Sequence, residues 1–247
     1  ADGRKPESVA ILHCVGSRDK NYNPYCSSIC CMQSLKFAHL AHEKTGAQVY
    51  NFYIDIRTPQ KDYEEFYNMV LDEGAIFVRG KVGEITDMPR TEAEEGKLIV
   101  QVFDTLGGIQ RRIPVDLVVL SAGLEPRADS HEVGKKFGIS CGTAGWMIER
   151  HPKLDPVATM TEGIFIAGCA QGPKDIPASV AQGAAAAARV IAKVQQGQMM
   201  LEPIRASIEE ERCSGCRICN TMCPFNAISY DEAKKVSVIN SALCQGC

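Results

Sequence analysis

Long apolar runs are missing from this 247-residue sequence, and so is any concentrated patch of positive charge. The longest apolar stretches, at residues 117–120 and 184–188, fall far short of the ~20 residues that a bilayer-spanning helix requires. Lys and Arg are scattered along a chain of net charge -3, which argues against binding to nucleic acid or to acidic membrane surfaces. The amino end shows no signal peptide. We therefore expect a globular protein that is soluble and cytoplasmic.

The G-x-G-x-x-G fingerprint of dinucleotide-binding folds is also missing. A conventional NAD(P)H oxidoreductase is therefore a weak hypothesis. No Ser-His-Asp arrangement or pair of carboxylates can be assembled, and the five histidines show no metal-ligand spacing. The sequence alone assigns no catalytic residue.

Cysteine, in contrast, is abundant. The chain has 12 cysteines, and most of them sit in tight clusters, whereas a disulfide scaffold spreads its cysteines between loops. Clustered thiols in a reducing compartment indicate metal binding. The roles of Cys141 and Cys169, which lie outside the clusters, stay open.

Apolar runs that alternate with helical periodicity indicate β-α units and an α/β fold in the first part of the chain. We expect helices at residues 27–44, with Gly46 as the cap, at 60–72 and at 178–196. Strands are expected at residues 9–15, 48–54, 76–85, 97–104, 110–113, 116–122 and 163–167. Gly197 and Pro203 bracket a linker, so we expect one domain at residues 1–202 and a second at 203–247.

The second domain opens with a C-x2-C-x2-C-x3-C-P run formed by Cys213, Cys216, Cys219, Cys223 and Pro224. This spacing is typical of bacterial ferredoxins, in which three close thiolates bind one iron-sulfur cube and the fourth serves a second cube. A zinc site is the alternative, but it would normally use two C-x2-C pairs or histidine, and no histidine follows His151.

A second ferredoxin copy begins at Cys244 and Cys247, where the sequence stops. A complete copy would supply one more ligand to each of two 4Fe-4S clusters. We infer that the chain is a piece of a longer protein. Short strands around residues 226–228 and 236–239 complete the expected α+β ferredoxin domain.

Near the amino end, Cys14, Cys26, Cys30 and Cys31 lie within 18 residues of one another. Cys14 ends the first predicted strand, where doubly wound folds place ligands. Buried free cysteines, a disulfide-exchange pair, a zinc site and an iron-sulfur cluster all remain open, because this spacing is no standard motif.

Two strands end in glycine in the manner of flavoprotein disulfide reductases, at residues 116–123 and 163–168. In such folds the second ending brings the backbone to the flavin, and the helix after it points its amino end at the ring system. The alanine-rich helix near residue 178 fits this place. Cys169 departs from the pattern, because an acidic residue commonly follows the second glycine.

Five segments closely resemble the A subunit of heterodisulfide reductase, an iron-sulfur flavoprotein family, in its carboxyl-terminal part. They are Cys14-Val-Gly-Ser-Arg-Asp19, Tyr25-Cys-Ser-Ser-Ile-Cys-Cys31, Phe52-Tyr-Ile-Asp-Ile-Arg57, His151-Pro-Lys-Leu-Asp-Pro156 and Ala170-Gln-Gly-Pro-Lys-Asp-Ile-Pro177. The resemblance implies a partial thioredoxin-reductase-like, Rossmann-type fold followed by the ferredoxin domain.

The resemblance further implies a 4Fe-4S cluster on the four amino-terminal cysteines, up to two more in the ferredoxin domain, and FAD. The implied FAD contacts are Gly168, Cys169, Ala170, Lys174, Asp175, Ile176, Val180 and Gln182. FAD would pass electrons singly into the clusters, in some members by electron bifurcation, and Lys174 could stabilise the reduced flavin.

The family also implies a multisubunit complex in which hydrogenase or formate dehydrogenase can be the partner. Two other hypotheses remain. One is an electron-wiring module without flavin, and the other is the equivalent subunit of a benzoyl-CoA reductase-type complex.

Overall fold

The structure is a computed structural model that describes residues 3–197, 204–241, 243, 244 and 246. The chain divides into two compact units, Ala1–Leu124 and Glu125–Cys247.

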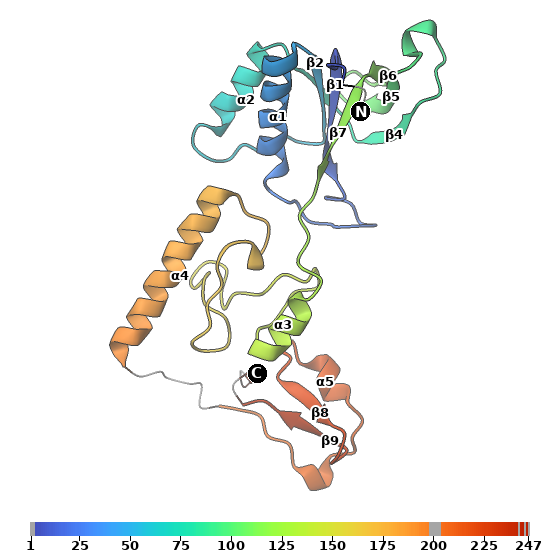
Figure 1. Ribbon diagram of the computed structural model, residues 1–247. Helices are drawn as coiled ribbons and strands as arrows, with labels where there is room; N and C mark the ends of the chain where they lie inside the picture. The colour runs from blue at the N-terminus through green and yellow to red at the C-terminus, as the bar shows by residue number, and fades with distance from the viewer. Residues whose placement is uncertain (1–2, 198–203, 242, 245, 247) are drawn as a thin grey trace. The chain divides into compact units, whose positions relative to one another are not determined.

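The first unit is built on a parallel sheet of four strands in the order β3-β2-β1-β7. Helices α1 and α2 cover one face of this sheet (Figure 1). The elements are β1 (Ser8–Val15), α1 (Cys30–Thr45), β2 (Gln48–Tyr53), α2 (Tyr63–Asp72), β3 (Ile76–Arg79) and β7 (Leu117–Ala122). The predicted β-α units are therefore confirmed.

The α1 helix starts at Cys30, although the sequence predicted a start at Ser27. Ser28 has a φ of 60°, a left-handed conformation that a right-handed helix cannot include, so the helix begins only after it. At the other end Gly46 adopts a φ of 72° and its N–H bonds to the His42 carbonyl, as predicted for the cap.

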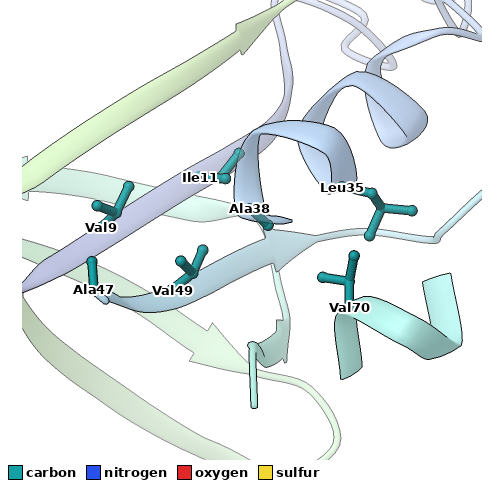
Figure 2. Close-up of a cluster of buried hydrophobic side chains, with 7 residues drawn as sticks. All are labelled: Val9, Ile11, Leu35, Ala38, Ala47, Val49 and Val70. Atoms are coloured by element: carbon teal, nitrogen blue, oxygen red, sulfur yellow. The ribbon is translucent and has the colours of Figure 1, made fainter. Parts of the chain in front are cut away.

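Alternating residues of β1 face two different cores, because side chains of a strand point to opposite faces in turn. Val9 and Ile11 pack with Leu35, Val49 and Val70, together with Ala38 and Ala47, under the two helices (Figure 2). Ala10 and Leu12 face the opposite side and pack against an antiparallel sheet.

That antiparallel sheet has the order β4-β5-β6 and consists of β4 (Val82–Thr86), β5 (Leu98–Asp104) and β6 (Ile109–Val115). A short 3-10 turn, η1 (Glu92–Glu94), lies between β4 and β5. The side chains of the antiparallel sheet that pack with Ala10 and Leu12 include Val100, Val102 and Val115. The parallel sheet is thus covered on both faces, as the apolar character of β1 requires.

The single strand predicted for residues 76–85 is wrong. Gly80 separates two strands that belong to different sheets, since β3 pairs with β2 and β4 pairs with β5. An added Cβ at Gly80 would lie 2.2 Å from the Phe103 carbonyl oxygen, so only glycine allows the chain to pass so close to β5.

The second unit contains α3 (Ser130–Phe137), η2 (Gly168–Ala170), α4 (Ile176–Gln196), η3 (Glu210–Arg212), α5 (Ile218–Met222), β8 (Ile228–Asp231) and β9 (Val236–Ile239). Asp175 begins α4 by accepting a hydrogen bond of 2.9 Å from the Ala178 N–H. Ion pairs from Arg189 to Asp155 (2.8 Å) and from Lys193 to Glu162 (3.0 Å) tie the second half of α4 to the preceding loop.

The buried strand predicted at residues 163–167 is also wrong. Phe165 forms only an isolated bridge with Ala158, and the Ile166 N–H bonds back to Val157 at 2.7 Å. A strand needs a neighbour along its whole length, and in the described part of the chain this segment finds only the short stretch before it.

The boundary between the structural units lies after Leu124, whereas the sequence placed a domain boundary near residues 200–205. Residues 198–203 lie outside the described residues, and the division into residues 1–202 and 203–247 stays a prediction. In the described part of the chain, no helix combines the length and the apolar character that a membrane crossing demands.

Leu35→Ala should lower the free energy of unfolding by about 2–5 kcal/mol, because Leu35 is fully buried between α1 and the sheet and its removal leaves a cavity. Urea denaturation followed by circular dichroism measures this. Leu106→Ala is the control, since this side chain lies exposed in the β5–β6 turn. Equal effects of the two substitutions would contradict the assigned core.

Glu94→Gln should lower the free energy of unfolding at pH 7. It should also make that free energy depend less on pH in the acidic range. The Arg112 guanidinium and the Arg90 N–H hold the pKa of Glu94 at about 2, against an ordinary value of 4.5. The charged form therefore stabilises the fold above about pH 4.5, and this contribution disappears as the pH falls toward about 2. Urea midpoints across this range test it, with exposed Glu92→Gln as the control.

Candidate iron-sulfur and flavin sites

The structure brings the four amino-terminal cysteines together at the carboxyl end of β1. Cys14 lies near the end of β1, Cys26 in the loop after it, and Cys30 and Cys31 in the first turn of α1. We call residues 14–31 the cysteine loop. Cys14, Cys30 and Cys31 all lie close enough to Cys26 for a negative charge on Cys26 to raise their pKa values.

The backbone of the cysteine loop is unusual, because φ is positive at every second residue from Cys14 to Arg18. The values are 58° at Cys14, 71° at Gly16 and 55° at Arg18. Two N–H groups of this stretch are used within the loop, since Ser17 donates to the Cys14 carbonyl at 3.1 Å and Arg18 donates to the Tyr25 carbonyl at 3.0 Å. Positive φ at residues with side chains costs free energy and clusters at functional sites.

The amino end of α1 is a source of positive potential in the cysteine loop. Its N-cap residue, Ile29, makes no side-chain hydrogen bond, and its first turn contains no acidic residue. The helix dipole is therefore left to act on Cys30 and Cys31, where it favours thiolates.

Burial opposes ionisation of the thiols in this loop. It raises the pKa of Cys30 to about 11 and raises the pKa values of Cys14 and Cys31 as well. The charges of Arg18 and Arg57 act in the opposite direction. Thiolate is the form that binds metal, so metal binding here would release protons.

Among the described residues, no three His, Cys, Asp or Glu side chains lie near enough to share a single metal ion. The thiol of Cys30 points at the Ala122 carbonyl (3.9 Å), and that of Cys31 points at the Asp55 carbonyl (3.7 Å). A cube of iron and sulfide needs wider spacing than one ion, because each thiolate binds a different iron atom. The donor set and the uncapped helix fit such a cube.

In the ferredoxin segment, Cys213 follows η3, Cys216 and Cys219 flank the start of α5, and Cys223 follows its end. Gly215 and Arg217 on either side of Cys216 have φ values of 69° and 62°, which repeats the alternation of the cysteine loop. Arg217 also stacks 3.8 Å from the centre of the Tyr230 ring and so fixes α5 against β8.

Backbone N–H groups point at several sulfurs of the ferredoxin segment. Ala227 donates to Cys223 at 3.4 Å and Ala206 donates to Cys244 at 3.3 Å. Backbone N–H groups also lower the pKa values of Cys216 and Cys244, which favours the thiolates. Cys247 lies outside the described residues. The ligand assignments in both segments stay predictions.

The residues expected at the flavin lie around the start of α4. Gly168, Cys169 and Ala170 form η2, and Gly168 needs its φ of 65°. The Cys169 thiol donates to the Lys174 carbonyl at 3.6 Å. Burial lowers the pKa of Lys174, while nearby Cys169 and Glu149 oppose this shift.

Further along α4, Ile176 and Val180 are exposed, whereas the Gln182 amide bonds to Gln171 (2.5 Å) and to the Pro156 carbonyl (3.4 Å). An added Cβ at Gly172 or Gly183 would meet no atom within 4 Å. The start of α4 therefore offers open space beside a helix dipole, which fits a flat ring system, although the Asp175 carboxylate already uses one N–H of that end.

Sequence reasoning missed the charged residues that surround the cysteine loop. The Arg18 guanidinium bonds to the Asp55 carboxylate at 2.8 Å, and Arg79 reaches the same carboxylate at 3.4 Å. Arg18 and Asp55 belong to two of the segments that carry the family resemblance, which was the available signal.

Comparisons with known proteins bear on the ferredoxin segment and on the fold. Residues 206–229 match the family described as 4Fe-4S binding domain. The chain also resembles a solved structure of thioredoxin reductase from T. acidophilum, with a TM-score of 0.50, 15% identity, and coverage of 78% of this chain and 54% of that one. The expected fold class is confirmed.

Three curated relatives match almost the whole chain. The A subunit of the Methanococcus maripaludis H(2)/formate:CoB-CoM heterodisulfide,ferredoxin reductase is 48% identical over 94% of this chain and 35% of its own length. An Archaeoglobus profundus protein named as similar to the A subunit of heterodisulfide reductase is 46% identical over 95% of this chain and 33% of its own. The iron-sulfur A subunit of CoB–CoM heterodisulfide reductase from Methanocaldococcus jannaschii is 47% identical over 94% and 35%.

The chain thus spans about a third of the length of the curated relatives it matches. The match nevertheless includes 94% of this chain or more, and it confirms the resemblance seen in the five sequence segments. Over nearly its whole length the chain is therefore similar to part of the heterodisulfide reductase A subunits.

Proposed function

We propose that this chain carries electrons between FAD and 4Fe-4S clusters within a cytoplasmic heterodisulfide reductase-like complex. Its similarity to heterodisulfide reductase A subunits and its 4Fe-4S domain support a role as part of an iron-sulfur electron-transfer subunit. The proposed cluster in the cysteine loop is supported by one observation above all. Four thiols, those of Cys14, Cys26, Cys30 and Cys31, come together where β1 ends and α1 begins.

The cysteine loop would hold one cluster and the ferredoxin segment would hold up to two. Positive φ at alternate residues occurs in both places, and in both places a backbone N–H group is aimed at sulfur, from Ser28 to Cys26 and from Ala227 to Cys223. Hydrogen bonds to cluster sulfurs are among the factors that set reduction potential. The two segments are therefore suited to accept single electrons.

The start of α4 would hold FAD through Gly168, Cys169, Ala170, Lys174, Asp175, Ile176, Val180 and Gln182. When bound, FAD supplies the exchange between two-electron and one-electron chemistry. Gly168 and Gly172 let the backbone approach a ring closely, and the ammonium group of Lys174 provides a partly buried positive charge. We include electron bifurcation in the proposal because the name of the M. maripaludis relative pairs a heterodisulfide with ferredoxin.

The partners we propose are the other subunits of such a complex, with hydrogenase or formate dehydrogenase as the electron source. The support is the M. maripaludis relative, whose name contains both H(2) and formate. Anaerobic quantification of iron, sulfide and flavin in the native protein tests the proposal. Clusters without flavin would replace it with a wiring module, and zinc without sulfide would overturn both.

Cys30→Ala should remove about four iron and four sulfide atoms per chain, because the cluster would lose a ligand at the amino end of α1. Chemical analysis and the visible spectrum measure the loss. Cys141→Ala is the matched control, since Cys141 lies in neither cysteine segment and its thiol bonds to the Ser130 carbonyl. An unchanged iron content in Cys30→Ala would contradict the assignment.

Lys174→Met should lower the midpoint potential of the flavin, because a positive charge near the ring favours its reduced, anionic form. Spectroscopic redox titration of the native protein with flavin bound measures the shift. Lys193→Met provides the control, because Lys193 lies near the other end of the same helix and pairs with Glu162. Equal potentials in Lys174→Met and the unmodified protein would remove Lys174 from the flavin site.

A further inference from the structure

Arg18 occupies a constrained position at the wall of the cysteine loop. Its backbone has a φ of 55°, and its N–H bonds to the Tyr25 carbonyl at 3.0 Å. Its side chain is only 22% exposed, and its charge and hydrogen bonding lower the pKa of the Cys14 thiol against the effect of burial. The guanidinium is therefore close enough to act on one of the four thiols.

Asp55 connects Arg18 to a second thiol of the same loop. Its carboxylate accepts from the Arg18 Nη2 at 2.8 Å and from the Arg79 Nη2 at 3.4 Å. Its main-chain carbonyl accepts from the Cys31 thiol at 3.7 Å. Asp55 thus contacts the cysteine loop twice, with its main-chain carbonyl at Cys31 and with its carboxylate at Arg18.

Fold stability does not account for this arrangement. The Asp55 side chain is 45% exposed, and ion pairs with such exposure contribute little to the free energy of unfolding. The left-handed backbone of Arg18 also opposes folding. A role in the chemistry of the loop explains why a guanidinium is held there at this cost.

One-electron reduction adds one negative charge to a cluster that four thiolates already make negative. A fixed positive charge in contact with a ligand sulfur stabilises the reduced form more than the oxidised form, and so raises the midpoint potential. Arginine keeps its charge at every relevant pH, so this effect does not depend on titration.

We propose that Arg18 raises the reduction potential of the cluster in the cysteine loop, and that Asp55 is the positioning residue that holds the Arg18 guanidinium against Cys14. The inference rests on the proposed cluster at Cys14, Cys26, Cys30 and Cys31. It adds residues outside the ligand set that decide how readily this cluster accepts an electron.

The test is a redox titration of the native protein followed by electron paramagnetic resonance. The signal of this cluster is identified as the one that Cys30→Ala removes. Arg18→Gln should shift its midpoint to lower potential while the iron content stays the same. An unchanged midpoint would overturn the role of Arg18.

Lys81→Gln is the matched control, because it also removes one positive charge from the neighbourhood of the loop. The Lys81 ammonium pairs with the carboxylate of Asp19, the residue that follows Arg18. Its substitution should shift the midpoint much less than Arg18→Gln, because the Lys81 ammonium contacts Asp19 whereas the charge of Arg18 acts on the Cys14 thiol itself. Equal shifts would show a general charge effect and would overturn the specific contact.

Asp55→Ala distinguishes two roles of Asp55, because positioning of Arg18 and the negative charge of the carboxylate predict shifts of the midpoint potential in opposite directions. Loss of a negative charge alone would raise the midpoint. Release of Arg18 from Cys14 should lower it, which is the result that we expect. A raised midpoint would overturn the positioning role of Asp55.

Arg18→Lys covers the case in which Arg18→Gln fails to assemble the cluster. Lysine keeps the charge but lacks the planar fork that can bond to Asp55 and Cys14 together, so a smaller downward shift is expected. A midpoint equal to that of the unmodified protein would show that the charge alone raises the potential and would overturn the positioning role of Asp55. Absence of any signal that depends on Cys30 would refute the cluster itself, which is a different outcome from an unshifted signal.

Discussion

The placement of thiols at a buried strand end is the constraint on which the first unit depends. A thiolate without water is costly unless positive charge or hydrogen-bond donors compensate it. The parallel sheet provides a solution, because its β1–α1 connection brings the strand end next to a helix amino end. The same connection contains left-handed backbone at Cys14, Arg18 and Ser28, which explains why α1 starts as late as Cys30.

The ferredoxin segment is under the same constraint, but its helix is too short to provide much positive potential. Its helix α5 has five residues and supplies little dipole, so backbone N–H groups take a larger part, as at Cys223 and Cys244. An arginine in left-handed conformation recurs at Arg217, but it pairs with Glu232 and stacks on Tyr230. Similar backbone geometry therefore has two uses. In the cysteine loop it places a positive charge near the thiols, and in the ferredoxin segment it anchors α5 to β8.

Much of this was readable from the sequence, because the decisive signals were local. The apolar runs predicted β1, β2 and β7, and the cysteine spacing predicted the ferredoxin segment. The errors arose where structure depends on distant partners. Residues 76–85 look like one strand until the Phe103 backbone passes beside Gly80, and residues 163–167 look like a buried strand but find no full-length neighbour in the described part of the chain.

The contact between Arg18 and Asp55 shows the same limit at the level of the site. The two residues are 37 positions apart, and only the parallel pairing of β1 with β2 brings their loops to one edge of the sheet. Sequence patterns find ligands because ligands have characteristic spacing. Sequence patterns do not find the charged groups that set the electrostatic potential around those ligands, since a residue from any neighbouring strand can supply such a charge. The electrostatics of the site therefore follows from the strand order, which must be known before these residues can be named.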